Sequence, residues 1–176
     1  MPAFRADVTR GKNFCIAVRA NFTYQAVALL IKPHPTHKVG ILEDLVKDYG
    51  RENIFLFDKR IDPYHVINVC DLTITKFSTI GIESMIFKKP VISVIIDRDE
   101  HWKVYGDAAE YVYTEEELAE LLSAVLSSPE TLEKWVRQQV AKQKAFLREY
   151  TIQSSNPSAE LSARAVVECI RNKRRD

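Results

Sequence analysis

A histidine between two prolines is the first group in the sequence that is suited to chemistry. His34 follows the apolar run Val27–Ile31 within the segment Lys32-Pro33-His34-Pro35. Because the prolines fix the backbone φ angle and remove two N–H donors, the imidazole is presented from a stiff loop. Imidazole can donate a hydrogen bond to a phosphate oxygen, or a proton to a departing phosphate, near neutral pH. The alternative is a half-exposed histidine in a turn, without a role.

A pair of hydroxyl groups follows a second apolar run. Leu72–Thr75 leads into Ser78-Thr79-Ile80-Gly81-Ile82-Glu83, where Ser78 or Thr79 is suited to cap a helix. The free N–H groups at such a helix start form a site for an anion such as phosphate. Gly81 adds no side chain that would block the anion, and Glu83, one turn further, is suited to accept hydrogen bonds from sugar hydroxyls such as a ribose diol. A capped helix with a solvated glutamate is the alternative.

Other polar groups give weaker signals. Lys32 and Lys76 could add charge to these two sites, but we expect both to point to solvent. The charged segment Asp97-Arg98-Asp99-Glu100-His101-Trp102 either borders a ligand or is a solvated loop. The sequence contains no Walker loop, GxGxxG, GxSxG or cluster of metal ligands, which argues against a P-loop NTPase, a dinucleotide oxidoreductase, an α/β-hydrolase and a zinc enzyme. We therefore predict no metal site.

The elements that carry these groups alternate between strand and helix. Most of the apolar runs are continuous, which is typical of strands that are covered on both faces. We predict strands at Phe14–Val18, Val27–Ile31, Ile54–Phe57, Leu72–Thr75, Val91–Ile96 and Tyr111–Tyr113. Helix starts are predicted at Asp62-Pro63, Thr114–Glu117, Ser128-Pro129 and Asn156-Pro157. The pattern predicts an α/β fold, a Rossmann-like three-layer sandwich with a mainly parallel sheet and two to three C-terminal helices.

We expect the chain to consist of one large domain and a short C-terminal part. Residues 1–150 form the Rossmann-like nucleotide-binding domain, in which ligands bind at the carboxyl ends of the strands. Residues 151–176 form a C-terminal helix that follows the polar break Thr151–Asn156, and its apolar stripe can pack on a partner domain that this chain lacks. The basic end, Arg171–Arg175, is most simply a solvated helix terminus.

Composition limits the classes of partner. The chain has 176 residues, of which 46% are hydrophobic, and its formal net charge is +1. No general basic field is present to hold nucleic acid, and no apolar run approaches the ~20 residues that span a bilayer. Cys15, Cys70 and Cys169 are widely spaced, which favours buried thiols in a reducing compartment. Because the first residues lack an apolar signal segment, we expect a cytoplasmic protein.

The ordered set of motifs resembles a known family. Lys-Pro-His-Pro after a strand, then Asp71, Ile74-Thr75, Ser78-Thr79, Gly81 and Glu83, then Lys89-Pro90-Val91-Ile92, is similar to the C-terminal domain of GT-B-fold glycosyltransferases. The similarity is greatest to the enzymes of surface polysaccharides, which include CDP-glycerol glycerophosphotransferases and polysialyltransferase-type enzymes. It covers roughly residues 25–130. UDP-N-acetylglucosamine 2-epimerases of the non-hydrolysing type share the architecture.

The resemblance implies a role for each motif. His34 would contact the donor phosphates and help the nucleotide leave, as the catalytic residue of this half. Ser78, Thr79 and Gly81 would line the phosphate site, and Glu83 would hold the ribose. The backbone around Asp58, after the strand Ile54–Phe57, would lie near the base. Transfer would be metal-independent, and no cofactor is implied, because the nucleotide-sugar or CDP-alcohol donor is itself a substrate.

The length departs from that family. GT-B enzymes have two such domains, and the N-terminal acceptor domain is missing here, so we expect either a fragment of a longer chain or a half that needs a partner. Through the full-length enzyme, the chain could also be peripheral at a membrane. Two alternatives stay open: a stand-alone nucleotide-sugar binding module without catalysis, and half of an epimerase-like enzyme.

Overall fold

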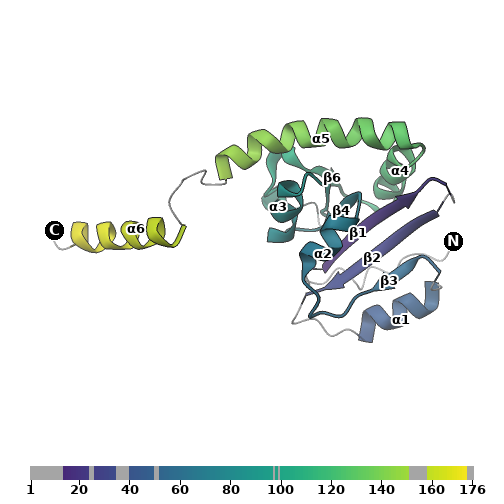
Figure 1. The fold of residues 1–176 in the computed structure, drawn as a ribbon, viewed down its shortest axis with the longest axis horizontal. Coiled ribbons are helices and arrows are strands. Elements are labelled where there is room, and N and C mark those ends of the chain that lie inside the picture. The colour runs from purple at the N-terminus through teal and green to yellow at the C-terminus, as the bar shows by residue number, and fades with distance from the viewer. Residues whose placement is uncertain are drawn as a thin grey trace.

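A computed structural model of the chain describes residues 14–23, 26–34, 40–49, 52–96, 98, 100–150 and 158–173. The predicted break at Thr151–Asn156, together with Asp97 and Asp99 of the charged segment, lies outside the described residues. Strands and helices alternate through most of the chain, as predicted (Figure 1). Their bounds are β1 (Phe14–Asn21), β2 (Ala26–Pro33), α1 (Gly40–Tyr49), β3 (Ile54–Leu56), α2 (Pro63–Val69), β4 (Leu72–Thr75), α3 (Thr79–Ile86), β5 (Val91–Val94), β6 (Glu110–Val112), α4 (Glu115–Val125), α5 (Pro129–Tyr150) and α6 (Ser158–Lys173).

The strands form one six-stranded sheet in the order β3-β2-β1-β4-β5-β6. The pairs β2–β3, β4–β5 and β5–β6 are parallel, whereas β1 is antiparallel to both of its neighbours. Five strands therefore share one direction, which confirms the predicted α/β sandwich with a mainly parallel sheet. The direction of β1 follows from chain length, since the few residues between β1 and β2 are too short for the crossover that a parallel pair requires.

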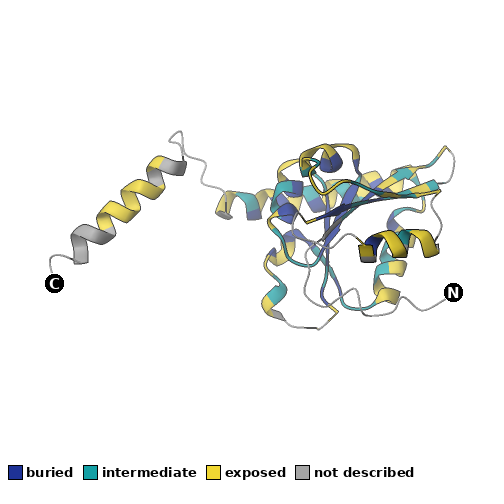
Figure 2. Ribbon diagram, turned by 90° about the horizontal axis from the view of Figure 1, so that it is seen from below, coloured by how far each residue is buried: buried dark blue, intermediate teal, exposed yellow. Residues whose placement is uncertain are grey.

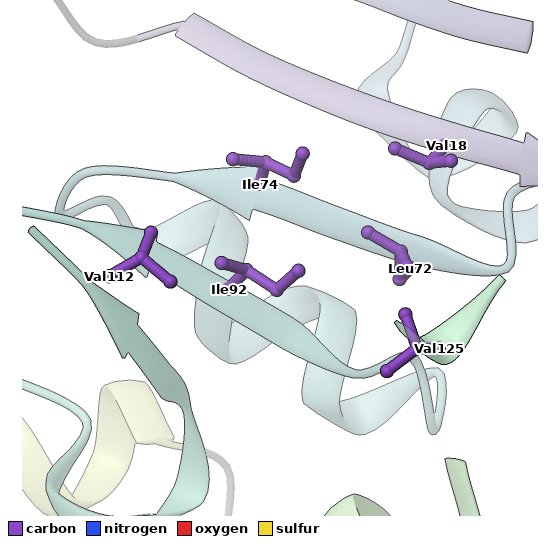
Figure 3. Packing of buried hydrophobic residues seen from close by; sticks show 6 residues of the cluster. All are labelled: Val18, Leu72, Ile74, Ile92, Val112 and Val125. Carbon is purple, nitrogen blue, oxygen red and sulfur yellow. The ribbon is translucent and has the colours of Figure 1, made fainter. Parts of the chain in front are cut away.

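The main core lies between one face of the sheet and α4. Six buried apolar residues from four strands and one helix form it, namely Val18, Leu72, Ile74, Ile92, Val112 and Val125. Figure 3 shows these side chains gathered along β1, β4, β5 and β6 with Val125 of α4 beside them. Leucines of α4 at helical spacing pack against the same cluster. The helix start predicted at Thr114–Glu117 is therefore confirmed, and its N-cap bond runs from the Glu117 N–H to Thr114 Oγ1 at 3.1 Å.

The opposite face of the sheet is covered by α2, α3 and the second half of α5. Val66 and Cys70 at the end of α2 pack on Ala17 and Leu30, and Met85 of α3 packs with Val91 and Phe146. Trp135 and Phe146 of α5 both contact the core. The last helix, α6, stands apart from the sheet in Figure 1, and its described side chains are exposed in Figure 2.

Candidate functional site at the carboxyl edge of the sheet

His34 and Ser78 leave the sheet at the same edge. Ile31 of β2 and Ile74 of β4 both pair with Ile16 of β1, so the three residues form one row across the sheet. Because β2 and β4 run in the same direction, the chain segments after this row project from the same edge. Adjacent strands lie about 4.8 Å apart, which separates β2 from β4 by about 10 Å. A diphosphate with its sugar can span that separation.

The His34 loop begins on a buried residue. Pro33 ends β2 and is fully buried, whereas His34 directly after it is exposed. In the β1–β2 hairpin, Pro33 pairs with Phe14 at the start of β1. The imidazole is therefore at the edge of the sheet on a backbone that the β1–β2 ladder holds.

Ser78, one of the two residues predicted as the cap, is the N-cap of α3. Its backbone is extended, and its Oγ accepts a hydrogen bond from the Ile80 N–H at 3.4 Å. Thr79, the first residue of the helix, is exposed, while Ser78 is half-buried. Glu83 is half-buried in the second turn of α3. The start of the helix thus faces the carboxyl edge with an exposed hydroxyl and the positive end of its dipole.

A tyrosine distant in the sequence fixes this helix start. The Tyr105 hydroxyl accepts a hydrogen bond from the Ser78 N–H at 2.7 Å and donates one to the Ser78 carbonyl at 2.6 Å. Its ring is only 1% exposed. A Cβ on Gly81 would lie 2.5 Å from the same hydroxyl. The structure therefore gives Gly81 a packing role, because the lack of a side chain makes room for Tyr105.

The prediction that Lys32 points to solvent is wrong. Its side chain is buried, and its Nζ donates to the Pro33 carbonyl at 3.0 Å and to the Lys59 carbonyl at 3.1 Å. Buried polar groups must be hydrogen-bonded, and the turn after β3 supplies the acceptor.

Asp58 follows β3, which is parallel to β2, so it also lies at the carboxyl edge. Its carboxylate accepts bonds from the Arg60 side chain at 2.9 and 3.1 Å and from the Arg60 backbone N–H at 2.8 Å. The hydrogen bonds from Arg60 lower the pKa of Asp58 from 3.8 to about 2. Asp58 therefore stays ionised, and Arg60 brings a guanidinium to the same turn.

An aromatic pair lies beside the start of α3. The rings of Phe77 and Trp102 stack with centroids 3.9 Å apart, and Lys76 Nζ lies 5.4 Å from the centre of the Trp102 ring. Trp102, in the segment after β5, is thus packed against the loop before Ser78 at the carboxyl edge.

Two hollows of the surface lie away from His34 and Ser78. A cavity of about 280 Å³ includes Asp71, Lys88 and Lys89, at the opposite edge of the sheet. A second, of about 420 Å³, includes Lys103, Tyr111 and Tyr113 beside β6. Neither is lined by His34 or Ser78. In the described part of the chain, no three His, Cys, Asp or Glu side chains gather as metal ligands, and no helix there is long and apolar enough to cross a bilayer.

Comparison with protein families agrees with this arrangement. Residues 1–156 match the model of the CDP-glycerol:poly(glycerophosphate) glycerophosphotransferases. The chain belongs to this family. The match confirms the predicted similarity to glycerophosphotransferases, and it spans β1 to α5 but not α6. No curated protein matches the chain.

Sequence reasoning missed Tyr105 and Arg60 at this site, and it named Lys32 but not its burial. Tyr105 could be suspected only from Gly81, because a glycine inside a helix often marks close packing. The burial of Lys32 follows from strand alternation, which places it on the same face as Leu30. Arg60 is two residues from Asp58, a spacing that permits the observed ion pair within one turn.

Proposed function

We propose that this chain is the donor-binding half of a GT-B-type glycerophosphotransferase, and that it holds CDP-glycerol or a related CDP-alcohol at the carboxyl edge of the sheet. The observation that carries the proposal is the position of His34 and of the α3 start on one edge, two strand spacings apart. Membership of the glycerophosphotransferase family supports the identity of the donor.

The chemistry proposed is a displacement at phosphorus. An acceptor hydroxyl attacks the phosphorus that carries the glycerol, the bond between that phosphorus and the bridging oxygen breaks, and CMP leaves with the electron pair. The hydroxyl proton goes to a base on another domain. His34 would hydrogen-bond to the departing phosphate or protonate it, and the start of α3 would stabilise its charge. We propose that these groups suffice without a metal.

The other predicted residues have parts in the same proposal. Ser78 and Thr79 would donate to the donor phosphates, Glu83 would accept from the ribose hydroxyls, and Asp58 with its turn would lie near the base. Residues 1–150 would carry this site, and residues 151–176 would contact the acceptor domain.

Calorimetric titration of the 176-residue chain with CDP, CMP and UDP tests the proposal. We expect CDP to bind, and we expect alanine at Ser78 and Thr79 to weaken binding by about 1.5–3 kcal/mol for each charge-assisted hydrogen bond lost. Thr114→Ala is the matched control, because it removes the N-cap of α4 instead of α3. No binding of CDP at millimolar concentration would refute the proposal.

A further inference from the structure

A buried lysine, Lys32, lies directly before His34 and has no acidic partner among the residues that the structure describes. The Lys32 side chain is 7% exposed, and both hydrogen bonds of its Nζ go to backbone carbonyls, those of Pro33 and Lys59. In the described part of the chain, no carboxylate lies within ion-pair distance of Nζ. An ammonium carries three N–H donors, and two are used here. Burying a charge is costly unless an opposite charge compensates it.

A second buried polar group lies on the same face of the sheet. Leu30, Ala17 and Thr73 form a row across β2, β1 and β4, and Lys32 and Thr75 each come two residues later on their strands. Both side chains therefore point to the face that α2 and α3 cover. Thr75 is 3% exposed, and its Oγ1 has no hydrogen-bond partner among the described residues. Figure 1 shows β2, β1 and β4 side by side at this edge.

We infer that Lys32 supplies the buried positive charge that attracts the diphosphate of the donor to this edge, with Thr75 as a second polar group of the same site. The inference rests on the proposed function and adds to it the group that makes the site selective for phosphate. A charge below the surface acts through a medium of low dielectric constant, so its attraction for an anion at the edge is stronger than that of a solvated lysine.

The test compares ligands that share a base and differ in phosphate. Cytidine and CDP are titrated calorimetrically into the wild-type chain and into Lys32→Met and Lys32→Arg. We expect Lys32→Met to weaken CDP binding by about tenfold or more, as loss of a charged partner does, while cytidine binding changes little. Lys32→Arg keeps the charge and should keep most of the preference for CDP.

Lys89 gives the matched control. Its Nζ also donates to two backbone carbonyls, those of Asn68 at 3.2 Å and Cys70 at 2.7 Å, but at the opposite edge of the sheet. Lys89→Met should leave the ratio of CDP to cytidine affinity unchanged. The inference is overturned if Lys32→Met keeps the wild-type ratio, or if Lys89→Met lowers it equally.

The result also separates this inference from the proposed function. A wild-type chain that does not prefer CDP to cytidine overturns both. A wild-type preference that survives in Lys32→Met overturns the role of Lys32 alone. If Lys32→Met fails to fold, Lys32→Gln takes its place, because glutamine keeps a hydrogen-bond donor and removes the charge. A folded Lys32→Gln protein that keeps the wild-type preference for CDP over cytidine overturns the inference.

Discussion

Replacing Gly81 with alanine tests whether packing fixes the start of α3. The new Cβ would lie 2.5, 2.6 and 2.9 Å from the Oη, Cζ and Cε1 atoms of Tyr105, closer than van der Waals contact allows. The ring cannot move freely, because it is buried, packs edge-on against Phe146 and is bonded to both backbone groups of Ser78. Overpacking of this kind costs about 1–3 kcal/mol, against about 1 kcal/mol gained from the helix propensity of alanine.

We therefore expect Gly81→Ala to lower the free energy of unfolding by up to about 2 kcal/mol and the melting temperature by several degrees. Urea denaturation followed by circular dichroism measures the first, and CDP affinity should fall as the helix start shifts. Gly40→Ala is the control, because its Cβ would meet no atom within 4 Å at the start of α1. A Gly81→Ala protein that is more stable than wild type by the ~1 kcal/mol that alanine brings to an unobstructed helix position would refute the packing role.

Three further predictions follow from individual side chains. His34→Ala should reduce transferase turnover in the full enzyme more than CDP affinity, and equal losses would argue against a role in leaving-group departure. Asp58 should titrate near pH 2 by NMR, and Arg60→Leu should return its pKa toward 3.8. Since this folded pKa is depressed, the stability that Asp58 contributes is present above pH 3.8 and is lost as the pH falls through about 2. Burial raises the pKa of Cys70 to about 12, so its thiol should resist alkylation at pH 8 in the native protein and react once urea unfolds it, as mass spectrometry can show.

The fold was predictable where the signals are local. Continuous apolar runs marked β4 and β5, and capping residues marked the starts of α2, α3 and α4. The antiparallel direction of β1 was not predicted, although the short link between Phe14–Val18 and Val27–Ile31 excludes a crossover helix. Both strands are also longer than the apolar runs, because polar residues such as Arg19 and Asn21 pair along the hairpin.

The candidate site was predictable only in part, for a physical reason. Ser78 and Gly81 stand out in the sequence, but the group that holds them, Tyr105, is 27 residues from Ser78 and carries no local mark. Lys32 appeared to be a surface charge because lysine is seldom buried, and its acceptor on Lys59 becomes visible only when β2 and β3 pair.

The most direct measurement is the change in backbone amide chemical shifts when CDP is added to the isotope-labelled chain. A donor site at the carboxyl edge predicts that the largest changes fall on His34, Ser78 and Thr79, and that they saturate together. The largest changes at Asp71, Lys88 and Lys89, around the cavity at the opposite edge, would contradict the proposal.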